Sequence, residues 1–168
     1  MLGMSLSTFT LVHVLISLVG IASGLVVLYG LLSGKRLDGW TALFLISTVL
    51  TSVTGFGFPF DHKVAILSLV LLAIAILARH GLHMAGAWRW IYVVTAVMAL
   101  YLNVFVLVFQ GFEKVPALKA LAPTQSEPPF LVAQLLVLAL FIVLGICAVK
   151  VSSRAGQLTI VIGLFCRA

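Results

Sequence analysis

Charged residues are scarce in this sequence. Its 168 residues include ten Lys and Arg and four Asp and Glu, so that 8% of the chain is charged and 63% is hydrophobic. Soluble globular chains contain about 25% charged and about 45–50% apolar residues. The mean hydropathy of +1.30 departs from such chains in the same direction. The composition therefore excludes an ordinary soluble domain and a disordered chain, and it predicts an integral membrane protein.

Cysteines and catalytic motifs are also scarce. Cys147 and Cys166 are the two cysteines, and their spacing is typical of neither a disulfide scaffold nor a metal motif. The sequence has no GxSxG motif of the kind that marks a nucleophilic serine. The basic residues lie between apolar runs, which suits membrane topology and anionic lipid and not nucleic acid. The missing motifs favour a protein that is not an enzyme. The placement of the basic residues favours the lipid bilayer as its partner.

Five apolar segments indicate an all-α bundle of about five transmembrane helices. They cover residues 9–32, 40–60, 64–78, 88–110 and 130–149. Four have the roughly 20 residues needed to cross a bilayer. The third is shorter, but Lys63 and Arg79 flank it and can extend to the headgroups. We therefore predict one transmembrane domain over residues 1–154, with an outer loop at 111–129 and a short cytoplasmic tail at 155–168.

The distribution of positive charge predicts the orientation. With five spans, Lys63, Lys114 and Lys119 lie on the side of the N-terminus. The other side carries seven basic residues: Lys35, Arg36, Arg79, Arg89, Lys150, Arg154 and Arg167. The positive-inside rule then predicts that the N-terminus is outside and the C-terminus is in the cytoplasm.

Small residues mark the expected helix contacts. His13, Ser17, Gly20 and Gly24 share one face of the first span, and the two glycines form a GxxxG motif. Such motifs usually allow two helices to approach closely within a membrane. Gly145 occupies a comparable position on the last span. We predict that Gly20, Gly24 and Gly145 lie at helix–helix contacts.

Polar side chains inside the spans gather in the outer half of the predicted bundle. The candidate ligand-binding residues are His13, Ser17, Thr51, Thr54, Asn103, Gln110 and Gln134. A polar cluster at one depth in a membrane is a functional-site hypothesis. The alternative is that these side chains hydrogen-bond one another and hold the bundle together. Apart from Arg89 at the start of the fourth segment, no span contains Asp, Glu, Lys or Arg, which argues against coupled ion transport.

The histidines suggest three candidate cofactors, none of which follows from a recognised motif. Haem would require two axial histidines, and His13 with His62 is the available pair on one side. A metal site would combine His13 and His62 with Asp61, which supply suitable ligand atoms. A quinone site on the opposite side would use Arg79, His80 and His83 beside the interfacial tryptophans. Anchoring of the helices at the interface explains those last residues equally well.

Two stretches carry a resemblance to known sequences. They are residues 39–60, Gly39-WTALFLISTVLTSVTGFGFPF, and residues 85–130, Ala85-GAWRWIYVVTAVMALYLNVFVLVFQGFEKVPALKALAPTQSEPPF. The chain resembles, over residues 9–150, a group of small bacterial polytopic membrane proteins of unknown function. The resemblance implies a multi-pass protein of the bacterial inner membrane and implies no mechanism.

The leading functional prediction is a non-enzymatic membrane component. It would bind a ligand or support a larger membrane complex or a homo-oligomer through the outer polar cluster. The main alternative is a redox protein that carries haem or quinone, with His13 as the residue to test first. A small permease is the second alternative.

Overall fold

The computed structural model describes residues 6–57, 62–82, 84 and 86–165, and side chains within these ranges from Ser7 to Arg154. Seven helical segments follow one another: α1 (Leu6–Leu32), α2 (Asp38–Gly55), α3 (Lys63–Ile76), η1 (Leu77–Gly81), α4 (Trp88–Lys114), α5 (Pro116–Leu121) and α6 (Pro128–Phe165). The described residues contain no strand, so the predicted all-α class is confirmed.

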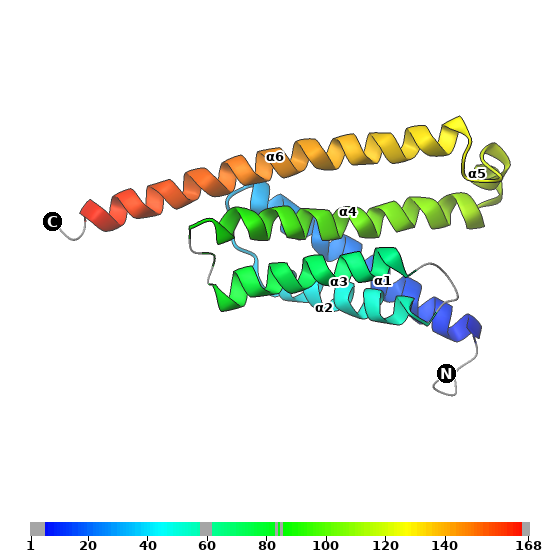
Figure 1. The fold of residues 1–168 in the computed structure, drawn as a ribbon, viewed down its shortest axis with the longest axis horizontal. Coiled ribbons are helices and arrows are strands. Elements are labelled where there is room, and N and C mark those ends of the chain that lie inside the picture. Colours follow the sequence, from blue (N-terminus) through cyan, green and yellow to red (C-terminus); the bar gives the residue numbers. More distant parts are fainter. Residues whose placement is uncertain (1–5, 58–61, 83, 85, 166–168) are drawn as a thin grey trace.

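The long helices run back and forth along one axis (Figure 1). The N-terminus and α5 lie at one end, and the C-terminus lies at the other. Four segments of the described chain are long and apolar enough to cross a membrane: Ser7–Leu32, Lys63–Gly81, Trp88–Lys114 and Pro128–Arg154. They indicate a multi-pass membrane protein.

The first connection ends α1 with a glycine. Gly34 has a φ of +66°, a left-handed conformation that favours a residue without a Cβ. The N–H of Lys35 donates to the carbonyl of Gly30 at 2.8 Å, which satisfies a carbonyl at the end of the helix. The chain then turns back into α2, whose first residue, Asp38, places a negative charge at the positive end of the helix dipole.

Two segment limits differ from the sequence prediction. The helix predicted to reach residue 60 ends at Gly55, and the N–H groups of Phe56 and Gly57 donate to Val53 and Thr54 in tighter turns. Gly57 lies so close to α1 that a Cβ there would be 2.8 Å from the ring of Phe9, so a larger residue would force this ring to shift. Pro59, within the segment predicted at 40–60, is outside the described residues.

The other difference is in α6. The last span was predicted over 130–149 with a tail after 154, but the helix continues to Phe165. No proline follows Pro129 in the sequence to stop it. Its 38 residues extend about 57 Å at 1.5 Å per residue, well beyond the roughly 30 Å hydrocarbon core of a bilayer.

The core lies where α2, α3 and α4 meet, with α1 and α6 closing it. Its most deeply buried large side chains are Phe44, Leu72, Tyr92, Val93 and Leu100. A smaller apolar cluster of Phe112, Ala122 and Phe130 joins α4 and α6 near α5. The short helix α5 lies within the loop predicted at 111–129, and its Leu118 packs against this cluster.

Candidate functional site

The polar candidates of α1 and α2 meet along one contact between these antiparallel helices. We call this contact the α1–α2 seam; it comprises His13, Ser17, Gly20 and Gly24 of α1 and Phe44, Ser47, Thr48, Thr51 and Thr54 of α2. At one end, His13 Nδ1 and Thr54 Oγ1 are 2.7 Å apart and share a hydrogen bond. At the other end, a Cβ added to Gly24 would be 2.9 Å from the ring of Phe44. The seam is thus polar toward the N-terminus and apolar toward the core.

A third helix, α4, contacts the middle of the seam. Asn103 of α4 donates from Nδ2 to Thr48 Oγ1 at 3.2 Å. A Cβ added to Gly20 would be 3.3 Å from the side-chain oxygens of Ser47 and Thr48 and 3.7 Å from Asn103 Nδ2. Gly20 therefore leaves the space in which the polar groups of α2 and α4 meet against α1.

Most hydroxyls of the seam bond to their own helix. Ser17 donates to the carbonyl of His13 at 2.7 Å, and Ser47 donates to Leu43 at 2.6 Å. Thr54 donates to Leu50 at 2.7 Å. Such bonds to the preceding turn satisfy a hydroxyl without any ligand.

Thr51 is the exception. Its Oγ1 is buried and has no hydrogen-bond partner among the described residues. Contacts of His13 with Thr54 and of Gly20 with Ser47 fix the register of the two helices, and this register places Thr51 at the level of Ser17. A buried hydroxyl without a hydrogen-bond partner lowers the free energy of unfolding by about 1–3 kcal/mol. Thr51 Oγ1 is therefore the atom of the seam that lacks such a partner.

The two glutamine candidates lie apart from the seam. Gln134 of α6 is 8% exposed and donates from Nε2 to the carbonyl of Phe105 on α4 at 3.2 Å. Its Oε1 is buried and has no partner among the described residues. Gln110 is partly exposed, and no hydrogen bond within the described chain connects it to the seam. The single cluster expected from the sequence is thus two groups, because Gln134 faces the α4–α6 contact.

The structure describes only some of the residues expected at the metal, haem and quinone sites. Asp61 and His83 are outside the described residues. The ring of His62 stacks on Phe56, with centroids 5.1 Å apart and planes 8° from parallel. Within the described ranges, no group of three or more His, Cys, Asp or Glu side chains could hold a metal ion.

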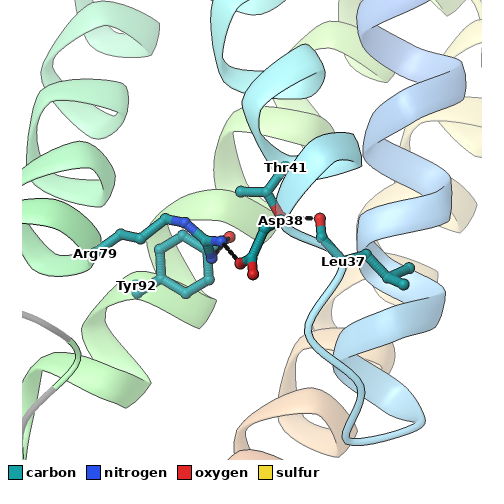
Figure 2. A network of polar contacts seen from close by, with 5 residues as sticks. All are labelled: Leu37, Asp38, Thr41, Arg79 and Tyr92. Atoms are coloured by element: carbon teal, nitrogen blue, oxygen red, sulfur yellow. Dashed lines mark hydrogen bonds and ion pairs between the residues drawn. The ribbon is translucent and has the colours of Figure 1, made fainter.

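A second polar network lies at the opposite end of the bundle (Figure 2). Arg79 of η1 forms an ion pair with Asp38 at the start of α2. Its guanidinium also donates to Tyr92 Oη at 3.5 Å and lies 5.5 Å from the centroid of that ring. The side chain of Arg79 is 13% exposed, and it ties α2, η1 and α4 together.

The sequence contained one signal for this network. Asp38 is the acidic residue near the basic residues of this end, so an ion pair between its carboxylate and one of them was to be expected. The π-turn of η1, closed by the Leu82 N–H bond to Leu77 at 3.0 Å, was not predictable from a pattern of apolar residues.

Comparison with protein-family models, curated proteins and solved structures finds no match to this chain.

Proposed function

We propose that α2 is a fifth membrane span. Its 18 residues extend about 27 Å, close to the thickness of the hydrocarbon core. Its hydroxyls point into the bundle, since Thr41, Ser47, Thr48 and Ser52 are buried. Its exposed side chains, Leu43, Ile46, Leu50 and Val53, are suited to lipid. The polar residues of α2 therefore lie on the face that packs inside the bundle, and its outward face is apolar.

The proposed topology has the N-terminus outside and the C-terminus in the cytoplasm of a bacterial inner membrane. The three lysines on one side against seven basic residues on the other support it. In a variant without native cysteines, a cysteine at Thr124 is expected to react with an impermeant reagent in intact cells. A matched cysteine at Lys35 should react only after lysis, and the reverse result would contradict this orientation.

The function we propose is that of a non-enzymatic membrane component that binds a ligand in the α1–α2 seam. The carrying observation is the buried, unpartnered Oγ1 of Thr51 in a contact whose other hydroxyls are bonded. A ligand with a hydrogen-bond donor would supply the partner that Thr51 Oγ1 lacks. Such a ligand is a small polar molecule or the polar end of an apolar molecule. His13, bonded to Thr54, closes the same contact toward the N-terminus.

The test is to purify the protein in mild detergent and to identify small molecules in its extracts by mass spectrometry. The wild type should retain one compound in stoichiometric amount, and Thr51→Val should lose it. Thr41→Val is the matched control, because that buried hydroxyl donates to Leu37 of its own chain at 2.9 Å. The control variant should retain the compound.

Two results would contradict the proposal. Extracts of the wild type without a stoichiometric compound would exclude ligand binding and favour support of a larger complex. An absorption spectrum with a Soret band that His13→Ala abolishes would favour the haem protein instead.

A further inference from the structure

The two ends of the bundle differ sharply in charge. Among the side chains that the structure describes, the end that holds the start of α1 and α5 carries Lys63, Lys114 and Lys119 together with Glu113 and Glu127. The opposite end carries six described basic residues and one carboxylate, Asp38. The net positive charge of the described residues is therefore concentrated at the opposite end.

Contacts between three elements gather these cations. The turn after α1 packs on α6, since a Cβ on Gly34 would be 3.7 Å from Val151 Cγ1. At the next residue of α6, the carbonyl of Ser152 accepts a hydrogen bond from Arg89 Nη1 of α4 at 3.3 Å. The start of α4 and the turn after α1 thus contact the same part of α6, which Figure 1 shows beside the end of α1.

We call the resulting patch the basic surface. It comprises Lys35, Arg36, Arg89, Lys150 and Arg154. Lys150 and Arg154 share a face of α6 because they are four residues apart. All except Arg89, which is half-buried, are exposed.

The basic surface has no neutralising carboxylate within the described residues. Asp38 is the acidic residue of this end, and it forms an ion pair with Arg79. The five cations therefore repel one another unless an anion from outside the chain lies among them.

The position of the basic surface favours a lipid as the source of that anion. The apolar segments Ser7–Leu32, Trp88–Lys114 and Pro128–Arg154 each have one limit at this end. Trp40 and Trp90 are each 48% exposed there, as is typical of side chains at the headgroup level of a membrane. A phosphate at this depth would come with acyl chains that can lie against the exposed apolar faces of the helices.

We propose that the basic surface is a binding site for the phosphate headgroup of an anionic phospholipid. Basic pockets formed between membrane helices are suited to such headgroups. The guanidinium groups of Arg36 and Arg154 can each donate two hydrogen bonds to phosphate oxygens, and the lysines add charge. The site is independent of the α1–α2 seam and of the ligand proposed there.

The three tryptophans of the chain provide a local reporter, since Trp40, Trp88 and Trp90 all lie at this end. The experiment titrates phosphatidylglycerol with brominated acyl chains into the protein in detergent micelles and measures quenching of tryptophan fluorescence. Brominated phosphatidylcholine is the lipid control. The wild type should bind phosphatidylglycerol about tenfold or more tightly than phosphatidylcholine, and added salt should weaken the preference.

Two pairs of substitutions test the surface from different elements. Lys35→Gln with Arg36→Gln, and separately Lys150→Gln with Arg154→Gln, should each lower the affinity for phosphatidylglycerol about tenfold to thirtyfold. Lys114→Gln with Lys119→Gln removes the same charge at the other end and should leave the affinity unchanged. Circular dichroism verifies that each variant is folded.

Three outcomes would overturn the proposal. One is a wild type that binds both lipids equally. Another is an equal loss in the Lys114 and Lys119 control, which would show a response to net charge alone. The third is a loss confined to one of the two test pairs, which would mean that the loop and α6 do not form one site.

Discussion

The α1–α2 seam and the α4–α6 contact are built by different means. In the seam, glycines and hydroxyls allow the helices to approach, and His13 bonds Thr54 directly. The α4–α6 contact is filled by aromatic rings: Tyr101 with Phe141 at 5.8 Å, Phe112 with Phe130 at 5.4 Å and Phe109 with Phe130 at 6.2 Å between centroids. The seam is close and rich in polar side chains, whereas the α4–α6 contact is filled mainly by large apolar side chains, with Gln134 as its buried polar residue.

The difference follows from the interactions that can hold helices together in a membrane. Lipid tails are as apolar as leucine, so apolar surface alone gives little association, and close packing or hydrogen bonds must supply it. The seam uses both. The aromatic contact relies on packing and leaves α6 mostly exposed, with 17% of its most apolar stretch buried against 44% for α4. We expect the seam to be sensitive to small changes in volume and the α4–α6 contact to tolerate them.

The largest expected effect is at the glycines. In Gly24→Ala the new methyl group would be 2.6 Å from Leu100 Cδ1 and 2.9 Å from the ring of Phe44, so these core side chains must move. We expect the free energy of unfolding to fall by about 1–3 kcal/mol. The measurement is unfolding of the purified protein by dodecyl sulfate, followed by circular dichroism.

Gly145→Ala is the matched variant on α6. Its methyl group would meet Val97 Cγ1 at 3.5 Å, an ordinary van der Waals contact. The helix propensity of alanine should then leave stability unchanged or raise it by up to about 1 kcal/mol. Equal destabilisation by both substitutions would remove the distinction between the two contacts.

The next effect concerns the buried amide of Gln134. Gln134→Met removes an unpartnered Oε1 at the expense of one hydrogen bond to Phe105. We expect the variant to be more stable by about 1 kcal/mol in the same assay, because an unsatisfied buried carbonyl costs more than one such bond contributes. A destabilised Gln134→Met variant would show that Oε1 has a partner.

Asn103→Leu, which loses the bond to Thr48, should be less stable by about 0.6 kcal/mol in the same assay.

A smaller effect is the coupling between His13 and Thr54. A double-mutant cycle with His13→Phe and Thr54→Val should give a coupling energy of about 0.6 kcal/mol, typical of hydrogen bonds within membranes. The same cycle with Ser23→Ala in place of His13→Phe should be additive, because Ser23 bonds to Val19 of its own helix. Additivity in both cycles would mean that the His13 bond does not stabilise the seam.

The smallest effect is a dependence on pH in the loop before α6. Partial loss of solvent raises the pKa of Glu127, but hydrogen bonds from the backbone and hydroxyl of Thr124 and from the N–H of Ser126 lower that pKa by more. A carboxyl with a lowered folded-state pKa stabilises the fold above its ordinary range and loses this contribution as the pH falls through the lowered pKa.

The matched variant for that loop is Glu127→Gln. We expect the difference in stability between wild type and variant to be small at neutral pH and to vanish toward about pH 3. A difference that is constant across this range would show that the carboxylate charge has no role in holding the loop.

The sequence by itself determined the class of the molecule and the approximate position of its helices. Long runs without charge can be stable as helices in lipid, where every backbone N–H and carbonyl must be bonded internally. Periodicity also placed His13, Ser17, Gly20 and Gly24 on one face, which the fold presents to α2 and α4. These properties depend on residues close together in the chain.

The tertiary structure alone decided which of these faces meet. It separated Gln134 from the seam, paired Arg79 with Asp38 across 41 positions of the chain, and brought the turn after α1 against α6. It also left Thr51 Oγ1 without a partner among hydroxyls that the sequence could not tell apart. Such outcomes depend on the register and order of packed helices, which are set by the volumes and hydrogen bonds of side chains from distant segments.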